Sequence, residues 1–140
     1  MRKSISYLLT AVLMFSVAGA VVAQENPQKP GKWQIKIETE MPGMPFKMPP
    51  VTTEVCLTEE DVKDPQKAVP NDPKSDCKVG DYKIDGKTVS WTMECPKQNM
   101  KGDGAITFSD ESYSGVMNMQ MGEQAMKMKY TGKWLGTCKK

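Results

Sequence analysis

The 140-residue sequence contains no histidine. Histidine is the commonest general base near neutral pH, the usual partner of a serine or cysteine nucleophile, and the commonest protein ligand of zinc and copper(II). A serine nucleophile would also need an elbow motif of the G-x-S-x-G type, and none occurs. We therefore expect a protein that is not an enzyme and that carries no cofactor.

An excess of charge of either sign is also missing. The chain has 19 basic and 17 acidic residues, and Arg2 and Lys3 at the N-terminus account for the difference, since removing them leaves 17 of each. Binding to nucleic acid phosphates needs a clustered basic excess. We expect no nucleic-acid partner.

Long apolar runs are missing everywhere except at the start of the chain. Arg2 and Lys3 precede an almost wholly apolar stretch over residues 5–22, and small residues up to Ala23 precede a polar sequence. This order of charge, apolar run and small-residue boundary is typical of a secretory signal, whereas a retained anchor needs a longer run with anchoring flanks. We predict a signal peptide over residues 1–23, cleaved near Ala23, and a periplasmic or secreted mature protein without a membrane span.

Cysteine is scarce, with four residues in the whole chain: Cys56, Cys77, Cys95 and Cys138. An even number in a small exported domain indicates two disulfides, and the spacings of 21, 18 and 43 residues do not fit the close pairs of a zinc site. We favour Cys77–Cys95 with Cys56–Cys138, although pairing in chain order remains open. One difficulty is that Cys56 falls with the polar positions of its strand, whereas Cys138 follows the apolar ones.

Two segments lack any periodicity. Residues 24–32 are polar and contain proline, so we expect a flexible leader before a single β-rich domain over residues 33–140. The sequence MPGMPFKMPP at residues 41–50 carries four prolines and one glycine, which predicts a connection.

The rest of the domain alternates between apolar and polar residues with a period of two, which predicts half-buried strands. We expect about seven: 33–41, 51–57, 79–84, 87–95, 105–108, 113–121 and 126–134. Asp85-Gly86 predicts a tight turn between the third and fourth strands, and a change of phase predicts a bulge near Gly80. Between the second and third strands, Thr58 precedes an acidic stretch and predicts the start of one short helix, which Pro65 should end.

These elements predict an all-β fold. The natural arrangement is an antiparallel meander, closed or nearly closed into a barrel to hide its edges, with one short helix after the second strand. The phase of the alternation predicts a large internal face rich in methionine and aromatic residues.

Several fragments occur in a familiar order: Pro30-Gly31-Lys32-Trp33, MPGMPFKMPP, Cys56-Leu57-Thr58-Glu59-Glu60, Asp76-Cys77-Lys78-Val79-Gly80-Asp81-Tyr82, Gly86-Lys87-Thr88-Val89-Ser90-Trp91 and Gly136-Thr137-Cys138. Together they resemble a family of small exported proteobacterial proteins known only as domain of unknown function 3617. The resemblance implies export and a β-rich domain. It implies no activity and no site residue.

The predicted internal face offers the first candidate site. A barrel open at one end can hold a small apolar molecule, so we consider a small apolar ligand or lipid as the partner. The candidate ligand-binding residues are Trp91, Met117, Met119, Met121, Met126, Met128 and Tyr130. The alternative is that these flexible side chains simply fill the core.

The proline-rich connection offers the second candidate site. Met41, Met44 and Met48 are spaced three and four residues apart, and thioethers are soft ligands that suit Cu(I). The alternative is that this segment is an apolar flap. If neither ligand binds, a structural or protein-interaction role remains.

Overall fold

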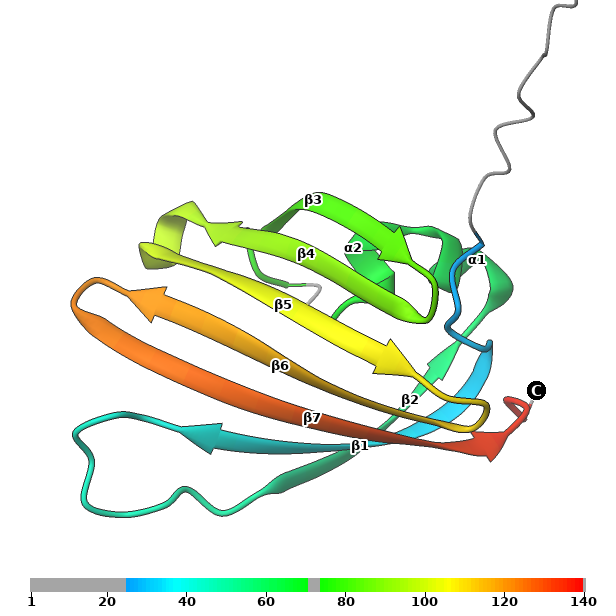
Figure 1. The fold of residues 1–140 in the computed structure, drawn as a ribbon, viewed down its shortest axis with the longest axis horizontal. Coiled ribbons are helices and arrows are strands. Elements are labelled where there is room, and N and C mark those ends of the chain that lie inside the picture. Colours follow the sequence, from blue (N-terminus) through cyan, green and yellow to red (C-terminus); the bar gives the residue numbers. More distant parts are fainter. Residues whose placement is uncertain (1–24, 71–73, 140) are drawn as a thin grey trace, which may run out of the picture.

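The computed structural model describes residues 25–70 and 74–139, so the predicted signal peptide lies outside the described residues. The described chain forms a single antiparallel sheet in the order β2-β1-β7-β6-β5-β4-β3, with two short helices between β2 and β3 (Figure 1). The strands are β1 Gly31–Glu40, β2 Val51–Leu57, β3 Lys78–Asp85, β4 Thr88–Cys95, β5 Met100–Phe108, β6 Ser112–Met121 and β7 Gln124–Gly136.

The predicted meander is confirmed, but the predicted barrel is wrong because the sheet does not close. The first strand β1 does pair with the last strand β7, as a closed meander requires. The sheet remains open at β2 and β3, each of which has only one neighbouring strand. These two strands are joined by the helical segment instead of a tight turn, so they lie at opposite edges of the sheet.

This connection contains two helices where one was expected: α1 Glu59–Lys63 and α2 Pro65–Ala68. Thr58 begins α1 with a capping box, in which its Oγ1 accepts from the Asp61 N–H at 3.1 Å and its own N–H donates to the Asp61 carboxylate at 3.0 Å. That hydrogen bond holds the pKa of Asp61 below its ordinary value. The first helix ends before Pro65 as predicted, and Pro65 also begins α2, because the first helical position needs no N–H donor.

The boundaries of every strand except β2 differ from the predicted ones, most of all at the start of β5. β1 begins at Gly31, β5 begins at Met100 instead of Ala105, and the tight turn between β3 and β4 consists of residues 86–87. The predicted bulge is confirmed, since the register of β3 shifts after Gly80.

The predicted assignment of residues to two faces is also confirmed. We call the face that carries Trp33, Trp91 and Tyr113 the inner face; it holds the core of the domain. Large side chains on this face lie over glycines of the neighbouring strand: a Cβ on Gly104 would meet the ring of Trp91, and one on Gly102 would meet Met119. Residues at the core of this face are therefore packed against each other, without space for a central barrel cavity.

Two disulfides brace the sheet in the pairing that the sequence favoured. Cys77 is joined to Cys95, with Cα atoms 4.0 Å apart, and Cys56 is joined to Cys138, with Cα atoms 5.8 Å apart. The difficulty of phase disappears because Cys138 lies beyond the end of β7, where the alternation no longer fixes its direction. Two disulfides indicate an oxidising environment outside the cytoplasm. Within the described residues, no helix has the length and apolar character needed to cross a membrane.

Candidate functional site

Of the predicted ligand-binding residues, Trp91, Met117, Met119 and Tyr130 are buried, Met126 and Met128 are half-buried, and Met121 is exposed. Met117 and Met119 lie on the inner face with only 2% and 4% of their surface exposed. The Tyr130 hydroxyl donates to the sulfur of Met117 at 3.7 Å and to that of Met128 at 3.3 Å, and burial raises the pKa of Tyr130 from 10.0 to about 12. Met121, in contrast, is 40% exposed at the end of β6. The buried members contact each other as core residues do.

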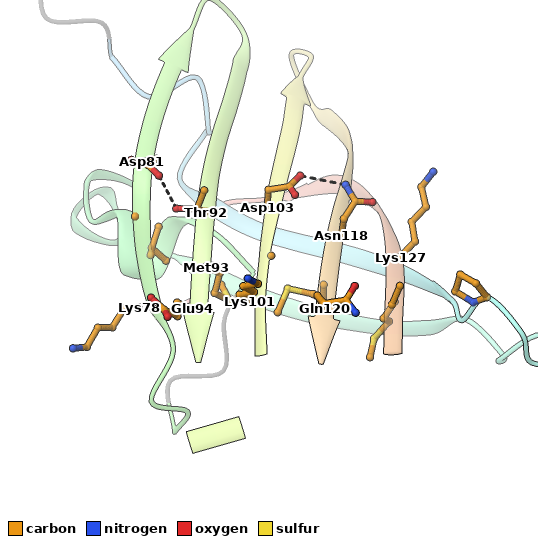
Figure 2. Close-up of a pocket in the computed structure, with 17 residues that line it drawn as sticks. Lys78, Asp81, Thr92, Met93, Glu94, Lys101, Asp103, Asn118, Gln120 and Lys127 are labelled. Atoms are coloured by element: carbon orange, nitrogen blue, oxygen red, sulfur yellow. Dashed lines mark hydrogen bonds between the residues drawn. The ribbon is translucent and has the colours of Figure 1, made fainter. Parts of the chain in front are cut away.

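The largest hollow, of about 870 Å³, lies on the opposite face of the sheet. Its floor is a row of paired residues that direct their side chains to the inner face, including Met93, Gly102 and Met119. Polar side chains on either side of this row form two walls that cross the strands, as Figure 2 shows. We call this hollow the polar groove.

The polar groove has balanced charge and internal hydrogen bonds. Thr92 donates to Asp81 at 3.1 Å, and Asn118 donates to Asp103 at 3.2 Å (Figure 2). Three lysines and three carboxylates line it: Lys78, Lys101, Lys127, Asp81, Glu94 and Asp103. With no net charge, no histidine and no aromatic side chain in its lining, the groove favours neither an ionic ligand nor acid–base chemistry.

Residues 25–30, which we call the N-terminal segment, pack against the domain where a flexible leader was expected. The Asn26 amide donates to the backbone oxygen of Val62 in α1 at 2.6 Å and to the hydroxyl of Tyr82 in β3 at 2.8 Å. Gln28 is 8% exposed, although it is polar. The segment thus lies between the helices and the inner face.

The C-terminal half of this segment is held by two tryptophans. The indole N–H of Trp33 donates to the Lys29 oxygen at 2.8 Å, and that of Trp134 donates to the Pro30 oxygen at 3.1 Å. The Lys29 ammonium also lies 3.6 Å from the ring centre of Trp134, a cation–π contact. These contacts fix the point at which the chain enters β1.

Two hollows adjoin the N-terminal segment. One, of about 400 Å³, lies between the segment, α1 and β3, and the other, of about 130 Å³, lies between the segment, α2 and the strands β1 and β2. Gln28 lines both. The larger hollow has Val62, Tyr82 and Ile84 in its walls. The apolar residues of the smaller hollow are Ile35, Val55, Leu57, Ala68, Val69, Pro70, Ile106 and Tyr113.

A narrow seam without room for a water molecule is bordered by Asn26, Gln28 and Trp91. Trp91 is 2% exposed, and its indole N–H has no hydrogen-bond partner among the residues that the structure describes. A buried donor without an acceptor costs about 1–3 kcal/mol. The smaller hollow is lined mostly by apolar residues, with Gln28 and Lys67 as its polar ones, whereas the larger hollow also has Glu25, Asn26, Gln28, Glu59 and Lys63 in its lining.

Apolar side chains also gather outside the core, at the end of the sheet formed by the loop after β1 and the turn after β6. We call this region the methionine end. Its exposed large apolar residues are Met44, Phe46, Met48, Val51 and Met121. A small cavity of about 40 Å³ here is lined by Met41, Met44, Met121 and Met126. The structure therefore divides the predicted loop trio, since Met48 does not line the cavity, and joins two of its members to strand methionines.

No pattern in the chain pointed to Asn26 or Gln28, because polar residues without periodicity are typical of unpacked leaders. Likewise, no pattern along the chain links residues 41–44 to residues 121–126, which only the pairing of β1 with β7 brings together. In the described part of the chain, no group of three or more histidine, cysteine, aspartate or glutamate side chains is placed to hold a metal ion.

No curated protein and no solved structure is significantly similar to the chain. One family model does match it, over residues 28–138, which is most of its length. The match begins at Gln28 and ends at Cys138, so it spans all seven strands and both disulfides. The chain therefore belongs to the family described as protein of unknown function DUF3617.

Proposed function

We propose that this is an exported, non-catalytic binding protein of the cell envelope, which takes one small apolar ligand, such as a lipid chain, between the inner face and the helices. The observation that carries the proposal is the pair of hollows of about 400 and 130 Å³ beside the N-terminal segment, with Gln28 lining both. The segment occupies the place where the two hollows would otherwise join.

The size and lining of the hollows suit an apolar ligand. Ligand pockets generally have volumes of about 300–1,000 Å³, mostly apolar walls and few polar groups. The larger hollow lies within that range, and joining the smaller one would extend it along apolar residues such as Val69 and Ile106. Lys63 and Lys67 in the linings fit a ligand whose polar end stays in water.

Displacing the front of the N-terminal segment requires little free energy. Asn26 makes two side-chain hydrogen bonds, to Val62 and Tyr82, and each contributes about 0.5–1.5 kcal/mol net. Each buried methylene group of a ligand contributes about 0.8 kcal/mol, so about four of them offset both bonds. Lys29 and Pro30 would remain held by Trp33 and Trp134. A short alkyl chain thus offsets the two side-chain hydrogen bonds of Asn26.

The unpaired indole N–H of Trp91 supports the same location. It borders the seam in which Gln28 lies, and it is the one buried side-chain donor without an acceptor in the described residues. A ligand with a carbonyl or ester oxygen would supply that acceptor. Once residues 25–28 are displaced, an ester-linked or free fatty acyl group would therefore suit this region better than a pure hydrocarbon.

The test is binding of the fluorescent apolar probe N-phenylnaphthylamine to the chain from Gln24 onward, followed by displacement with laurate. Asn26→Ala should tighten probe binding by about 5- to 150-fold, because the ligand no longer competes with two hydrogen bonds worth about 1–3 kcal/mol together. Ala68→Met, which fills the smaller hollow, should weaken binding.

The matched control is Asn118→Ala, which removes an asparagine hydrogen bond in the polar groove and should leave probe binding unchanged. Absence of probe uptake by both the unaltered protein and Asn26→Ala would refute the proposal. An equal effect of Asn118→Ala would also refute it, since the hollows would then not be the site.

A further inference from the structure

We propose that Met41, Met44, Met121 and Met126 form a second binding site, separate from the apolar hollows, which takes one soft monovalent cation of the Cu(I) type. These four methionines come from two segments about 80 residues apart and line one cavity of about 40 Å³ at the methionine end.

The first pair of methionines is presented by a tight turn. The Met44 N–H donates to the Met41 oxygen at 3.3 Å, and Gly43 has a φ of +89°. With Pro42 before it, this glycine fits a type II turn, which requires a positive φ at its third position and favours proline at its second. The Met-Pro-Gly-Met sequence thus places two thioether side chains at the two ends of one turn.

The second pair is presented by the turn between β6 and β7. Met121 pairs with Gln124 across this turn, Gly122 has a φ of +58°, and Met126 pairs with Met119 two residues further along. Because β1 pairs with β7 up to residue 40, the turn that follows β1 lies beside the start of β7. The sheet register therefore brings the two turns together.

The cavity has the size of an ion site. Its volume of about 40 Å³ is close to that of one water molecule in the liquid, about 30 Å³. That is room for one ion, whereas the N-terminal hollows are several times larger. The cavity is thus too small for the apolar ligand proposed above.

The chemistry of the lining selects among cations. Besides the four methionines, only Pro42, Gln124 and Ala125 line the cavity, so no carboxylate is present. Calcium and magnesium require several oxygen ligands, and structural zinc takes cysteine, histidine or carboxylate. Thioethers select soft ions such as Cu(I). Met44 and Met121 are 45% and 40% exposed, which gives an ion a route from solvent.

The experiment is a titration of the chain from Gln24 onward, labelled with ¹³C at the methionine methyl groups, with Ag(I), an air-stable analogue of Cu(I). The methyl signals of the four proposed ligands should shift and saturate at one equivalent, while those of Met117 and Met119 in the core stay unchanged. Cu(I) affinity measured by competition with a chelator should fall at least tenfold in the Met44→Leu/Met121→Leu variant, because leucine keeps the volume but removes the sulfur.

The matched control is Met48→Leu, in the same loop and outside the cavity, which should bind Cu(I) as the unaltered protein does. Weak shifts spread over all methionines without saturation at one equivalent would overturn the proposal, as would an equal loss of affinity in Met48→Leu. Both readouts are independent of probe binding in the N-terminal hollows, so either proposal can fail without the other.

Discussion

The indole ring of Trp91 lies against Gly104, its partner across the β4–β5 pair, in the space that a Cβ on Gly104 would occupy. The same relationship recurs further along the inner face, where Tyr113 lies over Gly132 across the β6–β7 pair. Glycine in a strand often marks such a close approach. The inner face is thus filled by large side chains that lie against glycines. A ligand would therefore have to bind beside the helices.

Gly104→Ala should destabilise the protein strongly, because the added methyl group has no space under the Trp91 ring. Overpacking of this kind costs about 1–3 kcal/mol, measurable as a lower midpoint in urea denaturation. Gly80→Ala is the control: its Cβ would meet only the Thr92 hydroxyl, at 3.0 Å, on the polar face. Similar losses of stability in both variants would show that the destabilisation comes from replacing a glycine in a strand and not from the contact with the Trp91 ring.

Met119→Ala should lower the free energy of unfolding by about 2–5 kcal/mol, since Met119 is buried and no central cavity relieves the loss. It should leave binding of the apolar probe unchanged. Met48→Ala, at an exposed position of the loop, should stay within about 0.5 kcal/mol of the unaltered protein. Urea denaturation followed by tryptophan fluorescence measures both, and a small loss for Met119→Ala would argue for an open pocket on the inner face.

The disulfide Cys56–Cys138 should be reduced before Cys77–Cys95 under mild dithiothreitol, because Cys56 is exposed on the edge strand whereas Cys95 is fully buried. Loss of the first bond should destabilise the protein by about 4.5 kcal/mol and loss of the second by about 3 kcal/mol, since the first closes the longer loop, of 82 against 18 residues. Alkylation and peptide mapping at increasing times gives the order of reduction. Simultaneous reduction of both bonds would contradict it.

Raising the pH should destabilise the fold through its buried tyrosines. Burial raises the pKa of Tyr130 from 10.0 to about 12 and raises that of Tyr113 further. A raised phenol pKa means that the folded state favours the protonated form, so this stability is complete below pH 10 and is lost as the pH rises from about 10 to about 12. Absorbance of tyrosinate should appear together with loss of folded structure in this range. Ionisation near pH 10 with the fold intact would show that these hydroxyls reach solvent.

The period of the alternation and the turn residues were sufficient to predict the strands and their faces. A side chain in a strand points to one of two sides, so Trp33, Trp91 and Met117 could be assigned to a common face from their spacing alone. The same local physics located the bulge near Gly80 and the helix start at Thr58. It missed the second helix, because a proline that ends one helix is also well suited to begin the next.

Other features were decided only by the tertiary structure, because they depend on contacts between residues far apart in the chain. Whether the sheet closes depends on how the segment from Thr58 to Cys77 crosses from one edge to the other, and the chain's local pattern carries no information about that path. The burial of Gln28 depends in the same way on the helices that cover it. The antiparallel pairing of β1 with β7 brings Met41 and Met44 to the turn that carries Met121. Met48 lies further along the same loop and does not line their cavity. The sequence by itself determined which residues form strands and which face of the sheet they share. The register of strands distant in the chain determined which of these residues meet, because the pattern within one strand does not specify its partner strand.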